Sequence, residues 1–167
     1  MSRAREMRRE SARLPGEARL ACALSTYHEE ITGAMLASAL DVLRGAGLSE
    51  ERVPVVRVPG TFELPLVARR LAQRPDVAAV LCFGLVLKGE TEHDRYIAQA
   101  CAQGLMQVAL DSDKPVLFGV LTCATLAQAQ ARARRSAEGG LDKGAEVAHA
   151  ALDVLAALRA ATEGEPR

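Results

Sequence analysis

The stretch VAAVLCFGLVLKGETEH, residues 77–93, decides the fold of this chain. Residues 77–87 are almost entirely apolar, which is typical of a β-strand buried on both faces of a sheet. A glycine turn follows the strand, and Thr91 is placed to cap the next helix. His93 falls in the first turn of that helix. A buried strand, a turn and a helix in succession predict the carboxyl edge of a parallel sheet, where α/β proteins commonly bind ligands.

The start of this helix is a predicted anion site, because helix N-termini present unpaired N–H groups and a partial positive charge. The same charge disfavours the imidazolium form of His93, so its ring is suited to taking or giving a proton near pH 7. A lone histidine is more commonly an exposed helix residue, but the glycine turn favours a functional role here. His28 and His149 lack that context and are expected at the surface.

Strands and helices alternate along the rest of the chain. The hydrophobic pattern predicts strands at 18–24, 53–58, 77–87 and 115–121. Predicted helices have apolar faces at Ile31, Met35, Ala39 and Val42, at Ile97, Cys101, Leu105 and Val108, and at Val147, Ala151, Val154, Leu155 and Leu158. The first of these ends near 45–47 and the last runs over about 142–161. Two more helices are predicted, from the 59–60 turn to about 72 and from the Thr125–Gln128 capping box to about 135.

This alternation predicts a three-layer α/β sandwich, a four-stranded parallel sheet with helices on both faces. Right-handed crossovers bring all four strand ends to one edge of the sheet. That edge would carry residues 25–27, 59–63, 88–93 and 121–122. We expect one domain over 18–161, with a basic, disordered or weakly ordered N-terminal tail at 1–17 and a frayed C-terminal tail at 162–167.

Composition limits the possible functions. Lys and Arg total 21 and so do Asp and Glu, so no net field favours nucleic acid or an anionic membrane as a partner. No secretory segment or span of about 20 apolar residues is apparent. The cysteines (22, 82, 101 and 123) lack metal-ligand spacing and are expected to be buried thiols. A reducing, cytoplasmic location without a metal site is the prediction.

Four other residues draw attention, and three of them have two interpretations. Tyr27 can stack on a flat ring or pack against a loop, and packing is commoner. Glu63 can accept hydrogen bonds from ligand hydroxyls or stabilise a helix start. Arg132 lies in an arginine cluster that is usually a solvated face, although a guanidinium can also bind phosphate. Lys143, just inside a helix start, suggests an anionic neighbour.

Taken together, six blocks resemble 6,7-dimethyl-8-ribityllumazine synthase in order and over about residues 18–158. They are STYHEEIT (25–32), VRVPGTFELP (56–65), KGETEH (88–93), PVLFGVLT (115–122), QAQARA (128–133) and DKGAE (142–146). A lone block would be weak, but six in register are specific.

The resemblance implies a flavodoxin-like fold and an enzyme that condenses 5-amino-6-(ribitylamino)uracil with 3,4-dihydroxy-2-butanone 4-phosphate, without cofactor or metal. It makes His93 the proton-transfer residue. Phosphate would be held by Arg132 and by the loop with Lys88, Gly89, Glu90 and Thr91. The other substrate would meet Tyr27, the block with Thr61, Phe62 and Glu63, and the backbone of Val86 and Leu87.

The resemblance also implies a homo-oligomer whose site lies between subunits. Phe118 and Lys143 would come from the neighbour, and for Arg132 both the same chain and the neighbour stay open. The expected ring is a pentamer, which some members pack into a sixty-subunit shell. The connection at 134–141 is longer than in many members, which favours a free pentamer.

Two departures from the family pattern stand out. Tyr27 replaces the usual Phe or Trp, and Asp94 and Arg95 follow His93 where an aromatic and an acidic residue are common. The alternatives are a non-catalytic flavin- or lumazine-binding oligomer and a related riboflavin synthase.

Overall fold

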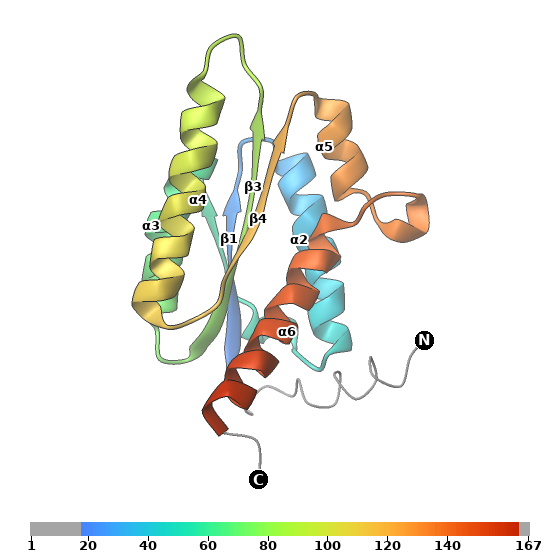
Figure 1. The fold of residues 1–167 in the computed structure, drawn as a ribbon. Helices are drawn as coiled ribbons and strands as arrows, with labels where there is room; N and C mark the ends of the chain where they lie inside the picture. The colour runs from blue at the N-terminus through green and yellow to red at the C-terminus, as the bar shows by residue number, and fades with distance from the viewer. Residues whose placement is uncertain (1–17, 164–167) are drawn as a thin grey trace.

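The computed structural model describes residues 18–163, which form a parallel sheet between two layers of helices (Figure 1). Within this range the sheet has four strands in the order β2-β1-β3-β4. They are β1 (Arg19–Ser25), β2 (Val55–Val58), β3 (Val77–Leu87) and β4 (Val116–Cys123). All three strand pairings are parallel. The predicted α/β class and sheet are confirmed.

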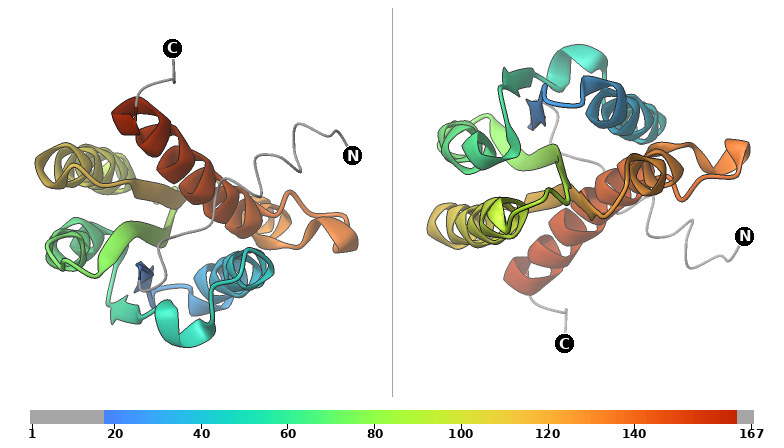
Figure 2. Two further views of the ribbon diagram at one scale, coloured as in Figure 1. Left: turned by 90° about the horizontal axis from the view of Figure 1, so that it is seen from below. Right: turned by 90° about the horizontal axis from the view of Figure 1, so that it is seen from above.

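Helices cover both faces of the sheet, as Figure 2 shows end-on. One face carries α2 (Glu29–Gly45), α5 (Leu126–Ala133) and α6 (Lys143–Glu163), and the other carries α3 (Leu64–Ala72) and α4 (His93–Ser112). Short 3₁₀ turns are η1 (Glu50–Arg52), η2 (Thr61–Glu63) and η3 (Ser136–Glu138).

Strand β3 separates two hydrophobic cores, which explains its unbroken apolar sequence. Leu81, Phe83 and Leu85 pack toward α2 and α6. Val80, Cys82 and Val86 pack toward α3 and α4. Because side chains alternate along a strand, only a strand covered on both faces is apolar at every position. The β3 boundaries match the prediction.

Other boundaries shift for local reasons. Strand β2 begins at Val55, two residues later than predicted, because the Val53 amide donates to Glu50 O of η1 at 2.9 Å. Strand β4 extends to Cys123, since Lys88 N donates to Cys123 O at 2.9 Å. Helix α5 ends at Ala133 rather than near 135.

The buried face of α6 matches the predicted one in part: Ala151 is buried, and Val147 and Leu155 pack against the core. Ala148, Ala151 and Leu152 are buried, whereas Val154 and Leu158 are 40% and 41% exposed. Helix α6 crosses α2 so closely that a Cβ at position 144 would overlap the Met35 carbonyl, so glycine is required there. Val154 and Leu158 lie on the surface of the single chain.

The four cysteines are buried free thiols, as predicted. Burial raises the pKa of Cys22 and of Cys101 to about 12, and it also raises the pKa values of Cys82 and Cys123. At neutral pH these thiols are protonated and unreactive.

Two expectations concern the chain ends and membranes. The predicted tails fall on residues 1–17 and 164–167, outside the described residues, while residues 162–163 continue α6. The proposed domain division remains a prediction. No helix within residues 18–163 combines the length and apolar character that crossing a membrane requires.

Candidate functional site

A cavity of about 770 Å³ opens at the carboxyl edge of the sheet. It lies between the end of β3, the start of α4, η2 and the loop after β1. Of the predicted site residues, ten line it: Tyr27, Thr61, Phe62, Glu63, Val86, Leu87, Lys88, Gly89, Thr91 and His93. Residues from three separate strand ends therefore meet at one site, as parallel topology requires.

The anion end of the cavity is the loop from β3 into α4. His93 is the first residue of α4 and its side chain is exposed. Glu92, and not Thr91, is the N-cap residue, so the predicted cap was one residue early. The Thr91 hydroxyl still accepts a hydrogen bond from His93 N at 3.4 Å. The amides of Gly89, Glu90 and Thr91 have no acceptor within residues 18–163, so these donors are available to an anion.

The opposite wall is η2, which follows the turn at Gly60. Glu63 Oε2 accepts a hydrogen bond from Gly60 N at 2.9 Å, so this carboxylate does stabilise a helix start. The Glu63 side chain is nevertheless exposed on the cavity, and Phe62 beside it is 59% exposed. Both interpretations of Glu63 are thus compatible with its position. Thr61 is only 5% exposed, and its hydroxyl donates to Leu85 O at 3.2 Å.

The third wall is the loop between β1 and α2. Tyr27 is 70% exposed, and its ring meets the His28 ring edge-on with centroids 4.8 Å apart. Hydrogen bonds from Thr26 N to Val58 O and from Tyr27 N to Pro59 O tie this loop to the end of β2. Tyr27 therefore presents its ring to the cavity instead of packing into the core.

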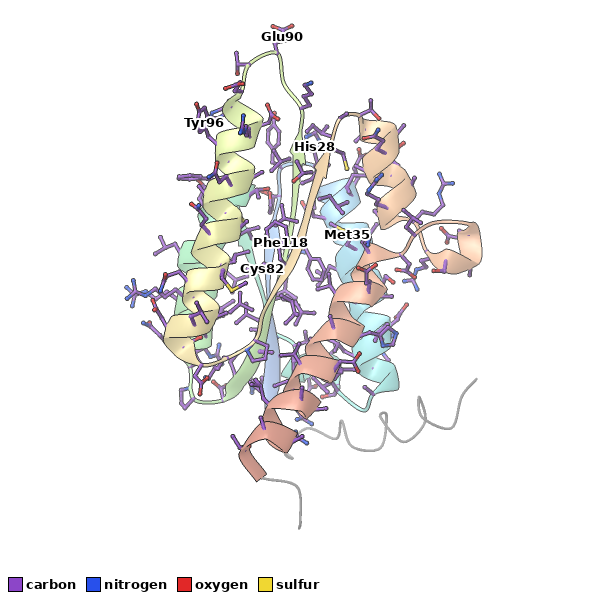
Figure 3. All side chains as sticks on the ribbon, in the orientation of Figure 1. His28, Met35, Cys82, Glu90, Tyr96 and Phe118 are labelled. Atoms are coloured by element: carbon purple, nitrogen blue, oxygen red, sulfur yellow. The ribbon has the colours of Figure 1, made fainter. Side chains whose placement is uncertain are left out.

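His28 was wrongly predicted to be an ordinary surface residue. It is half-buried, lines the cavity and has a left-handed backbone with φ 68°. Its carbonyl accepts hydrogen bonds from Ile31 N and Thr32 N at the start of α2. Few non-glycine residues adopt this conformation, and such outliers cluster at ligand sites. Figure 3 shows His28 close to the carboxyl edge of the sheet.

The cavity also includes residues that were not predicted: Gly60, Leu85, Asp94, Tyr96 and Ile97. The last three follow His93 by one, three and four positions, so they share the first turns of α4. Residues three and four positions apart are neighbours on a helix surface, so the spacing from His93 could have predicted Tyr96 and Ile97.

Four predicted residues lie outside the cavity of their own chain: Glu90, Phe118, Arg132 and Lys143. Figure 3 shows Glu90 at the tip of its loop and Phe118 well below it along the sheet. Phe118 is 47% exposed on β4, which is an edge strand.

Arg132 and Lys143 belong to the α5 and α6 side of the molecule. Arg132 Nη1 donates to Gln128 O at 3.0 Å, and within residues 18–163 this guanidinium has no carboxylate partner. Lys143 pairs with Glu146 at 2.6 Å, which supplies the anionic neighbour that its position suggested. Lys88 is thus the one Lys or Arg lining the cavity, among the described residues, beside the acidic Glu63 and Asp94.

The cavity offers proton transfer by His93, amide donors for an anion, and exposed aromatic and carboxylate groups for a polar ring-bearing ligand. No group of three or more His, Cys, Asp or Glu residues suited to a metal ion occurs in residues 18–163.

Comparison with known proteins shows the family to which the chain belongs. Residues 17–159 match the family model described as 6,7-dimethyl-8-ribityllumazine synthase. A protein of that name from Thermus thermophilus is 46% identical over 142 residues, covering 85% of this chain and 88% of its own. Another from Stenotrophomonas maltophilia is 46% identical over 143 residues, covering 86% and 90%. A third, from Salinibacter ruber, is 41% identical over 146 residues, covering 87% and 91%. The chain therefore belongs to the 6,7-dimethyl-8-ribityllumazine synthase family.

Proposed function

We propose that this chain is the enzyme that condenses 5-amino-6-(ribitylamino)uracil with 3,4-dihydroxy-2-butanone 4-phosphate to 6,7-dimethyl-8-ribityllumazine, releasing phosphate and water. This is the penultimate step of riboflavin biosynthesis. The observation that carries the proposal is that His93 and the unpaired amides of Gly89 and Thr91 line the same cavity as Phe62 and Glu63. A proton-transfer group, an anion site and a polar wall are what the reaction needs.

His93 exchanges protons with the phosphate-bearing substrate. Imine formation, loss of phosphate and ring closure each move protons at carbon, nitrogen or oxygen atoms near the phosphate. The His93 ring stands at the end of the loop whose amides are free, so a phosphate held by residues 88–91 brings the reacting carbons toward the imidazole.

The diaminouracil lies against the opposite wall. Tyr27 stacks on the pyrimidine ring, and its large exposed face supports that role. The backbone of Val86 and Leu87 binds the pyrimidine edge. Phe62 contacts the ribityl chain, and the free oxygen of Glu63 accepts hydrogen bonds from the ribityl hydroxyls.

Phe118, Arg132 and Lys143 complete the site of a neighbouring subunit. Their positions outside their own cavity support this arrangement, as does the lack of an ion pair for Arg132 among the described residues. A dianionic substrate requires more positive charge than Lys88 brings to a cavity whose lining also includes the carboxylates of Glu63 and Asp94. Arg132 of an adjacent chain supplies that charge.

The activity is tested by incubating the purified full-length chain with both substrates and following the absorbance and fluorescence of the lumazine product. Phosphate release is measured in parallel and should match product formation mole for mole. Product binding without any turnover would instead indicate a non-catalytic lumazine-binding oligomer.

We expect a homopentamer of 17.8 kDa chains, about 89 kDa in total. A site that each chain completes head-to-tail with its neighbour uses a heterologous interface, and such an interface forms a closed ring when the rotation between subunits closes. Exposed Phe118 on edge strand β4, and Val154 and Leu158 on α6, are apolar groups that an interface would cover. Light scattering coupled to size-exclusion chromatography measures the mass. A particle near a megadalton would mean a shell, and an active monomer would contradict the shared site.

We also propose that the protein works in the cytoplasm with small molecules and copies of itself as partners. Its four free thiols fit a reducing compartment. Localisation of a tagged full-length chain by cell fractionation tests this.

A further inference from the structure

We propose that Thr61 is a positioning residue that fixes the ribityl-binding wall of the cavity through its hydroxyl group. The inference rests on the proposed function, because it assigns Phe62 and Glu63 to that substrate. Thr61 was expected to bind substrate itself, but its side chain is 5% exposed and its hydroxyl donates to Leu85 O at 3.2 Å. Its hydrogen bond joins η2 to β3, the two elements that face each other across the cavity.

The Leu85 carbonyl needs this partner because β1 ends too early to supply one. Pairing between β1 and β3 stops at Leu24 and Phe83. On the other edge of β3, Val80 N and Lys88 N both donate to carbonyls of the β4 side. Backbone groups alternate between the two edges of a strand, so the odd-numbered Leu85 carbonyl points away from β4. The Thr61 hydroxyl takes the place of the missing strand.

Gly84 makes the close approach of η2 possible. A Cβ at position 84 would lie 2.8 Å from Thr61 Oγ1 and 3.0 Å from Leu64 Cδ1. The absence of a side chain at position 84 and the hydroxyl of Thr61 therefore act together. They hold η2 against β3 at the level of Val86 and Leu87, with Phe62 and Glu63 exposed on the cavity.

The test compares Thr61→Val, which keeps the shape and removes the hydroxyl, with Thr61→Ser, which keeps the hydroxyl. Thr61→Val should raise the KM for 5-amino-6-(ribitylamino)uracil about fivefold, the effect of one lost hydrogen bond. The KM for the phosphate-bearing substrate should stay within about twofold, since the loop at 88–91 is unaltered, and Thr61→Ser should resemble wild type. Gly84→Ala should have the same selective effect as Thr61→Val, because its new methyl group displaces the same contact.

Ser25→Ala is the matched control. Ser25 is fully buried near the end of β1, and its hydroxyl has no hydrogen-bond partner within residues 18–163. Ser25→Ala deletes a buried hydroxyl from the same region without breaking a hydrogen bond. The KM values for both substrates should therefore be unchanged.

Equal increases in both KM values, or a Thr61→Ser variant as impaired as Thr61→Val, would overturn the positioning role. Affinity for 6,7-dimethyl-8-ribityllumazine, measured by its fluorescence, separates this inference from the proposed function. Wild-type protein that binds the product without turnover overturns the enzymatic function alone, and Thr61→Val must then still weaken product binding about fivefold. Wild-type protein that neither binds nor turns over would overturn both.

Discussion

Replacing His93 with alanine is expected to lower kcat about a hundredfold while the protein remains folded. General acid–base groups contribute on the order of 10²- to 10⁴-fold, and we expect the lower end because water or the substrate phosphate can substitute. The His93 side chain is exposed, and the hydrogen bond from position 93 to Thr91 uses the backbone amide, which alanine retains. Steady-state kinetics at saturating concentrations of both substrates measure the effect.

His149→Ala is the control for this substitution. His149 is exposed on α6, far along the chain from the cavity residues, and is not part of the cavity lining. Its loss should leave kcat and the melting temperature unchanged. Wild-type turnover by His93→Ala at saturating substrate would remove His93 from the mechanism.

Strand β3 shows why the fold could be predicted from the sequence. Its eleven apolar residues meet two cores, so the pattern left one structural solution. Helix α6 shows the limit of such patterns. Its apolar positions exceed what one chain buries, because Val154 and Leu158 remain exposed. Periodicity marks apolar residues without saying which of them pack within the chain.

Sequence could predict those residues of the candidate site that are placed by the end of one element and the start of the next. Gly89 and His93 are placed by the end of β3 and the start of α4, which sequence reveals. His28 was missed because its left-handed backbone and its contact with Tyr27 arise from the docking of a loop onto β2. The hydrogen bond from Thr61 could not be foreseen, because its acceptor, Leu85 O, lies 24 residues away and lacks a strand partner only because pairing with β1 stops early.

Arg132→Ala is expected to raise the KM for 3,4-dihydroxy-2-butanone 4-phosphate about 10- to 150-fold and to change kcat far less. Hydrogen bonds to charged groups are worth about 1.5–3 kcal/mol, and a guanidinium binds phosphate through two of them. Arg132 is suited to this because its recorded bond is to Gln128 O on its own helix, which an incoming phosphate can replace. The KM for the diaminouracil should stay near the wild-type value, since that substrate lies against the other wall.

The neighbouring arginines provide the controls that decide whether Arg132 is the phosphate ligand. Arg135 is engaged elsewhere: its Nη1 lies 2.5 Å from Asp41 Oδ2, and this hydrogen bond lowers the pKa of the Asp41 carboxyl. Arg135→Ala would therefore disturb the link between the α5–α6 connection and α2, which makes it a poor comparison. Arg134 is exposed, and Arg134→Ala removes the same charge two residues away without breaking an ion pair that the structure records. The opposite result, a raised KM for the phosphate-bearing substrate in Arg134→Ala but not in Arg132→Ala, would mean that a different face of this segment binds the phosphate. Arg134, and not Arg132, would then be the arginine that enters the neighbouring subunit's site.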